Sequence, residues 1–214
     1  FYDSYKTYLD LSDWNLSSLQ SLSQAFRQMT KVTYIKLAGD FRNLTTLSYA
    51  FYQCSSATEI DLSGMIISSK LVDMNTTFAA MSKLVRVSFP SNLEESGLTT
   101  FSHFTDCTIS NLDIYNYRIP PSATNVGAWN FGGVGGIKTF VNLHNVYIGN
   151  NEILTNGLFR TIAIKSINDD IEFNPNVSTC NRSNAFLVIS SSIIPSPKTA
   201  AKSLTLLNRR FAIR

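Results

Sequence analysis

The chain has 214 residues, a formal net charge of +3 and charged side chains at only 15% of its positions. Residues 1–100 hold 8 Lys+Arg against 9 Asp+Glu, and residues 101–214 hold 10 against 6, so the positive excess lies late in the chain. This small and uneven excess argues against a nucleic-acid-binding protein, which needs a basic face. No apolar run is long enough to cross a bilayer, so we expect no membrane span in this chain.

The first repeated feature is a triplet with the pattern apolar-x-apolar. Four clear copies follow one another, at Leu9/Leu11, Ile35/Leu37, Ile60/Leu62 and Val87/Phe89. Two further openings are predicted at Leu112 and Phe140, which gives spacings of 26, 25, 27, 25 and 28 residues. Spacings in this range are typical of leucine-rich repeats. The alternation within each triplet predicts a short strand with one face inward.

A second apolar stripe follows each opening at spacings of 3, 4 and 3 residues. Its first three copies are Leu19/Leu22/Phe26/Met29, Leu44/Leu47/Phe51/Cys54 and Leu71/Met74/Phe78/Met81. This spacing is typical of one face of a helix. We therefore predict an α/β leucine-rich-repeat solenoid, with a parallel β-sheet on the concave face and short helices on the convex face. Phe26, Phe51, Phe78 and Phe104 are predicted to occupy equivalent core positions in successive coils.

The pattern becomes less regular after Leu112. Pro120–Pro121 ends any regular element there, and the glycine cluster at 132–136 fits a helix position poorly. Ile171–Phe173 is interpreted as the opening of a seventh unit, and two apolar runs follow at 185–189 and 210–213. The prediction is a solenoid of about six units over residues 1–172 and an irregular closing repeat or C-terminal cap over 173–214. Residues 1–8 do not resemble a polar cap, and we expect further chain upstream of them.

The segments LDLSDWNLSSLQSLSQAFRQM and IDLSGMIISSKLVDMNTTFAAM resemble the BspA-like branch of bacterial leucine-rich repeats. The resemblance is strongest over residues 8–90, extends to residue 115, and weakens beyond. It implies a surface-exposed module for adhesion to protein or glycan, and similar repeats also occur on phage appendages.

The cysteines and histidines carry no catalytic or metal-binding motif. Cys54 and Cys107 hold the same repeat position two units apart, about 10 Å, which is beyond disulfide reach and predicts buried thiols. Cys180 stands alone, and His103 and His144 lie in no nucleophile or zinc arrangement. No enzyme activity, cofactor or metal is predicted.

Asp169, Asp170 and Glu172 are a cluster of carboxylates near the end of the sixth unit. They lack the spacing of a calcium loop, so we interpret them as a solvated turn.

Side chains that flank the buried positions of each strand should form ladders across the outer side of the sheet. The central ladder is predicted as Asp10, Lys36, Asp61, Ser88, Asp113 and Asn142, and the two flanking ladders as Tyr8, Tyr34, Glu59, Arg86 and Asn111, and Ser12, Ala38, Ser63, Pro90, Tyr115 and His144. The predicted ligand-binding residues on the concave face are Tyr8, Asp10, Tyr34, Lys36, Glu59, Asp61, Arg86, Ser88, Asp113 and Tyr115. Tyrosine is enriched at interfaces, although isolated exposed aromatic residues also occur without a binding role.

Three functions remain open. The first is a non-catalytic extracellular recognition or adhesion module that binds protein or glycan on a cell surface, displayed on a bacterial cell or a virion. The alternative is a structural or receptor-binding part of a phage tail or fibre, in contact with copies of itself or a larger particle. The third is an accessory domain of a hydrolase. Solution mass separates the first two, since the assembly part is expected to be an obligate oligomer without a ligand.

Overall fold

The computed structural model describes residues 6–100, 103–104, 107–109, 111–124, 140–150, 163–167 and 171–177. The glycine cluster at 132–136, the Asp169–Asp170 pair, Cys180 and the two late apolar runs lie outside these residues. The first residues, 1–5, lie outside them as well.

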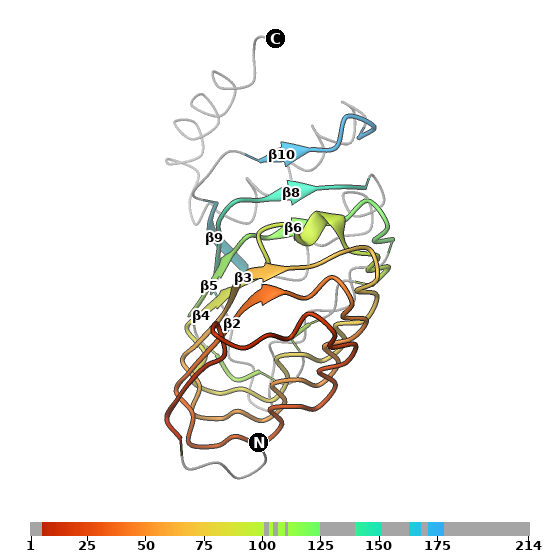
Figure 1. The fold of residues 1–214 in the computed structure, drawn as a ribbon. Helices are drawn as coiled ribbons and strands as arrows, with labels where there is room; N and C mark the ends of the chain where they lie inside the picture. The colour runs from red at the N-terminus through yellow and green to blue at the C-terminus, as the bar shows by residue number, and fades with distance from the viewer. Residues whose placement is uncertain are drawn as a thin grey trace, which may run out of the picture.

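A parallel sheet of seven strands joins successive coils of the chain, in the order β1-β2-β3-β4-β5-β7-β9. The coils stack in chain order from the N-terminal end, as Figure 1 shows. The strands are β1 (Tyr8–Asp10), β2 (Tyr34–Asp40), β3 (Glu59–Ile66), β4 (Arg86–Ser88), β5 (Asn111–Tyr115), β7 (Phe140–Leu143) and β9 (Ala163–Ile167).

The apolar triplets set the register of the first four strands. Leu9 lies opposite Ile35, Ile35 opposite Ile60, and Ile60 opposite Val87. All four are buried, while their neighbours on either side along each strand are half-buried or exposed. The predicted parallel sheet with one inward face is therefore confirmed.

A second, three-stranded parallel sheet begins after β5, in the order β10-β8-β6 (Figure 1). Its strands are β6 (Arg118–Ile119), β8 (Tyr147–Ile148) and β10 (Glu172–Phe173). Ile171–Phe173 therefore does not open a unit, because Glu172 and Phe173 pair with β8 while β9 takes the place beside β7. The predicted boundary between residues 172 and 173 falls inside β10, and the division into solenoid and cap stays a prediction.

In the coils that the structure describes, the predicted helices on the back of the solenoid are wrong. The one helical segment in the described part of the chain is the three-residue 3₁₀ helix η1 (Leu93–Glu95). The back legs are instead successive turns with left-handed residues four positions apart, namely Gln24 and Gln28, Tyr49 and Gln53, and Thr76 and Ala80.

Hydrogen bonds between coils replace those of a helix on this side. The backbone N–H groups of Leu22, Gln24, Phe26 and Gln28 donate to the carbonyls of Thr46, Ser48, Ala50 and Tyr52 in the next coil. Intervening N–H groups donate three residues back, as Ala25 does to Leu22. The buried stripe thus recurs at helix-like spacing without helical hydrogen bonding.

The back legs of neighbouring coils stack too closely to hold helices. An α-helix with its side chains is about 10–12 Å wide, whereas neighbouring strands lie about 4.8 Å apart. Rings on the back legs repeat at nearly the strand interval, since the centroids of Phe26 and Phe51 are 5.4 Å apart. Because the strands and the rings of the back legs repeat at similar intervals, the back adds little curvature to the stack. The solvent side of the seven-stranded sheet is called the outer face.

The phenylalanine column confirms the predicted repeat alignment. Phe26, Phe51, Phe78 and Phe104 are all buried, and their successive centroid distances are 5.4, 5.7 and 5.1 Å. Stacked aromatic pairs stabilise a fold by about 0.5–1.5 kcal/mol each beyond the burial of their area. The column and the strand triplets together form one continuous core along the stack.

Candidate functional site

The ten predicted ligand-binding residues all lie on β1 to β5 and alternate with buried residues. The pattern is clearest in β1, where Tyr8 and Asp10 are exposed on either side of the buried Leu9. It continues in β3, where Glu59 and Asp61 flank the buried Ile60. The sheet therefore gathers side chains from five separate parts of the chain on one face, as the alternation predicts.

Across β1 to β4 two of the three ladders have the predicted register, whereas in the third an irregularity after Lys36 places Ala38 opposite Gly64 rather than the predicted Ser63. Tyr8, Tyr34, Glu59 and Arg86 lie opposite one another in turn, and Asp10, Lys36, Asp61 and Ser88 form the neighbouring row. Between β4 and β5 the prediction is wrong by two residues. Val87 lies opposite Ile114 rather than Leu112, so Asp113 faces Arg86 and Tyr115 faces Ser88.

Tyr8 and Tyr34 form a stacked pair at the N-terminal end of the outer face. Their ring centroids are 4.8 Å apart and their planes differ by 8°. Tyr8 is 56% exposed, and its hydroxyl donates to Asp10 Oδ2 at 3.4 Å. The pKa of Tyr34 is raised, mainly by partial burial and next by the negative charge of Asp61. This end of the face therefore combines flat aromatic surface with negative potential.

Two ion pairs cross the strands of the outer face. Lys36 Nζ lies 3.9 Å from Asp10 Oδ2, and Arg86 Nη1 lies 3.6 Å from Glu59 Oε1. All four side chains are about one-third exposed or more, and such pairs contribute about 0–1 kcal/mol to stability. Their main effect here is to hold Lys36 and Arg86, the two cations among the ten predicted ligand-binding residues, beside carboxylates.

Asp10 and Asp61 close the same kind of local turn in the first and third coils. Oδ1 of Asp61 accepts bonds from the Ser63 N–H and hydroxyl at 3.0 and 2.6 Å. Asp10 accepts the corresponding bonds from Ser12, which lower the pKa of its carboxyl group. These bonds fix the direction of both carboxylates.

The C-terminal end of the outer face carries a second planar array. The guanidinium carbon of Arg86 lies 5.3 Å from the centroid of the Tyr115 ring, and Tyr115 stacks on His144 with centroids 4.0 Å apart. Beside them, Asn142 Nδ2 donates to Asp113 Oδ1 at 2.6 Å. The predicted neighbourhood of Tyr115 and His144 is therefore confirmed, and Asn142 adds an amide to the row that contains Asp113.

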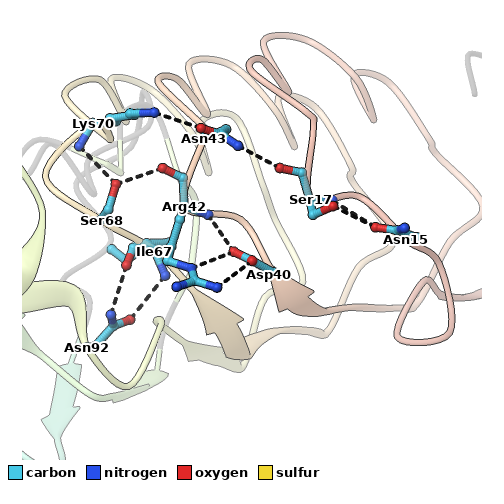
Figure 2. Close-up of polar contacts among 9 residues, drawn as sticks. All are labelled: Asn15, Ser17, Asp40, Arg42, Asn43, Ile67, Ser68, Lys70 and Asn92. Atoms are coloured by element: carbon cyan, nitrogen blue, oxygen red, sulfur yellow. Dashed lines mark hydrogen bonds and ion pairs between the residues drawn. The ribbon is translucent and has the colours of Figure 1, made fainter.

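A second polar strip follows the corner where β2 and β3 end, as Figure 2 shows. Arg42 forms a bidentate contact with Asp40, with its Nη2 2.7 Å from Asp40 Oδ2. Lys70 Nζ donates to Asn43 Oδ1 at 2.7 Å, and Asn43 Nδ2 donates to the Ser17 carbonyl. Each of these bonds links neighbouring coils or closes a local turn, so the corner strip mainly orders the turns.

The Arg118 cluster was not predicted from the sequence. Arg118 is 13% exposed, and its guanidinium contacts Glu94 at 2.8 Å, Glu172 at 2.9 Å and Asn145 Oδ1 at 2.9 Å. It also lies over the Tyr147 ring at 5.0 Å. Arg118, Tyr147 and Glu172 share one register position of the second sheet. In the sequence, the alternating triplets 117–119 and 146–148 were the signal that could have predicted the strands of this sheet.

Cys54, Cys107 and His103 belong to the core. Cys54 and Cys107 are buried free thiols, as predicted, and each donates to the carbonyl of a column phenylalanine. Burial raises the pKa of Cys54 to about 11. His103 is fully buried with Nδ1 2.9 Å from the Met74 carbonyl, and burial lowers its pKa to about 4. No group of three His, Cys, Asp or Glu suited to a metal occurs among the described residues.

Comparison with known protein families identifies a match over most of the chain. A family model described as BspA type leucine rich repeat region matches the chain in 6 copies, over residues 1–131 and 74–187. No curated protein and no solved structure matches the chain significantly. Within the part of the chain that the structure describes, no helix has the length and apolar character needed to cross a membrane.

Proposed function

The chain belongs to the BspA-type leucine-rich repeat family, and from this membership we propose that it is a recognition module acting through the outer face of its seven-stranded sheet. Repeats of this family typically form a non-catalytic interaction module, and the family is commonly related to surface adhesion. The proposed partners are proteins or glycans on a cell surface. The proposed location is outside the cell, on a bacterial surface or a virion.

The observation that carries the proposal is the order of the outer face. Five strands present tyrosines and charged residues in continuous rows, with the stacked pairs Tyr8/Tyr34 and Tyr115/His144 at the two ends. Backbone pairing on both the sheet and the back legs fixes these rows. A surface that is ordered before binding loses less conformational entropy when a partner docks.

The experiment is binding to arrays of immobilised proteins and glycans. Tyr34→Ala and Asp61→Ala on the outer face are expected to weaken binding, and Tyr52→Ala on the back leg serves as the matched control. Tyr52 is also a half-buried tyrosine, and it contacts Arg27 rather than the sheet. Binding that survives both outer-face substitutions would contradict the proposal.

The alternative is a structural or receptor-binding part of a phage tail or fibre. Mass measurement in solution distinguishes the two functions. A monomer with an outer-face ligand supports recognition, and an obligate oligomer that binds no array component supports assembly.

A further inference from the structure

The charge of the outer face differs in sign from that of the whole chain. Over β1 to β5 the face carries four carboxylates, Asp10, Glu59, Asp61 and Asp113, against the two cations Lys36 and Arg86, or −2. The chain as a whole is +3. A local acidic surface on a basic protein favours a partner of positive charge and disfavours polyanions.

Asp61, unlike Asp10 and Glu59, forms no ion pair among the described residues. Lys36 faces Asp61 in the register, but its Nζ lies 3.9 Å from Oδ2 of Asp10, which is in the same row on the strand on the other side. Arg86 lies 3.6 Å from Glu59. The bonds that Asp61 accepts come from the neutral Ser63, and Lys36, which stands between Asp10 and Asp61 in this row, pairs with Asp10.

Aromatic rings lie beside that carboxylate. Asp61 is near enough to Tyr34 to raise the pKa of its hydroxyl, and Tyr34 stacks on the exposed Tyr8. A carboxylate next to tyrosine rings suits a cationic side chain, because the rings attract its charge and its aliphatic stem can cover them. Neutral sugars would use the rings but not the charge.

We propose that the outer face over β1 to β3 binds a cationic segment of a partner protein, with a lysine or arginine side chain held between Tyr34 and Asp61. This inference rests on the proposed function and adds the chemical class of the partner. It concerns charge and not identity, so the probe is a lysine-rich peptide rather than a particular protein.

The test compares three probes by calorimetry: a lysine-rich peptide, a glutamate-rich peptide of equal length, and a neutral oligosaccharide. The lysine-rich peptide is expected to bind, and its affinity to fall as salt rises from about 50 to about 200 mM. Asp61→Asn is expected to weaken binding about three- to tenfold, because it removes the charge and keeps the Oδ1 acceptor of the Ser63 turn.

Asp73→Asn is the matched control. Asp73 lies on the back leg, and its Oδ1 accepts the Asn75 N–H at 2.9 Å in a turn of the same kind. This variant changes the net charge equally and is expected to leave binding unchanged. Equal effects of the two variants, or no effect of Asp61→Asn, would overturn the inference by showing nonspecific attraction.

The two proposals fail differently. If the glutamate-rich peptide or the oligosaccharide binds instead, and Tyr34→Ala weakens that binding, the cationic partner is wrong while the outer face remains the recognition surface. If no outer-face substitution changes the binding of any probe or array component, both proposals are wrong.

Discussion

Phe51 and Phe78 stack with ring centroids 5.7 Å apart and planes 9° apart, although they belong to different coils. Phe51 also stacks on Phe26, so its ring is enclosed from both sides. Phe51→Ala is therefore expected to lower the free energy of unfolding by about 3–5 kcal/mol. Urea titration checks this, with Val72→Ala as the control, because Val72 is 54% exposed. A cost for Phe51→Ala as small as that of Val72→Ala would contradict the stacked column.

Two arginine–carboxylate contacts predict a difference in stability. Arg118 is 13% exposed and joins Glu94 and Glu172 from other coils, whereas Arg42 is 64% exposed and contacts Asp40 two residues away. Arg118→Ala is expected to cost roughly 2–3 kcal/mol, since it removes the ion pairs with Glu94 and Glu172 and the hydrogen bond to Asn145 from a guanidinium near the core. Arg42→Ala should have little effect. Equal midpoints for the two variants in urea would show that Arg118 does not join the coils.

A threonine ladder at the start of the strands ends at Val85. Thr33 Oγ1 donates to the Thr7 carbonyl at 2.9 Å, and Thr58 Oγ1 donates to the Thr33 carbonyl at 3.1 Å. Val85 holds the next position, with its N–H on the Thr58 carbonyl, and is 53% exposed. Val85→Thr is expected to stabilise the protein by about 0.5–1 kcal/mol, and Thr58→Val to destabilise it by a similar amount. Thermal unfolding of both variants checks this, and a shift of both in the same direction would contradict it.

His103 predicts acid sensitivity. Its pKa is lowered to about 4 by full burial, which outweighs the opposing effects of the Met74 carbonyl and the Asp73 charge. The unfolded chain binds the proton more tightly, so the stability from neutral His103 is complete above about pH 6.5 and is lost as pH falls toward 4. Between pH 7 and about pH 4.5 the loss is about 2–3 kcal/mol.

The control for this effect is His103→Gln, which cannot be protonated. Carboxylates titrate in both proteins, so the measured quantity is the difference between their losses of stability over this pH range. The wild type should lose more. Equal losses would mean that His103 is not shielded from protons in the folded state.

The part of the fold that the sequence predicts well is the part fixed by alternating burial. Leu9, Ile35 and Ile60 lie opposite one another because a shift of one residue would expose every buried side chain. A shift of two residues keeps the alternation, and Leu112 and Ile114 are both apolar. The pattern therefore could not show that Ile114 rather than Leu112 faces Val87.

The helices were predicted from the spacing of Leu22, Phe26 and Met29. That spacing shows which residues are buried, but it does not show which backbone groups are hydrogen-bonded to each other. Turns with left-handed residues at Gln24 and Gln28 give the same spacing. The coils stack too closely on this side to hold helices. This spacing depends on how neighbouring coils pack, so the sequence of a single repeat does not show it. For the site, alternation placed the ten residues on one face, but contacts such as that of Arg86 with Tyr115 depend on the register.

The most direct test of recognition through the outer face is NMR of tyrosine-labelled protein with and without a bound partner. Tyr8, Tyr34 and Tyr115 lie on the sheet, while Tyr49 and Tyr52 lie on the back leg and contact each other. A partner bound at the outer face is expected to shift the ring signals of Tyr34 and Tyr8 and to leave those of Tyr49 and Tyr52 in place. Shifts confined to Tyr49 and Tyr52 would contradict it.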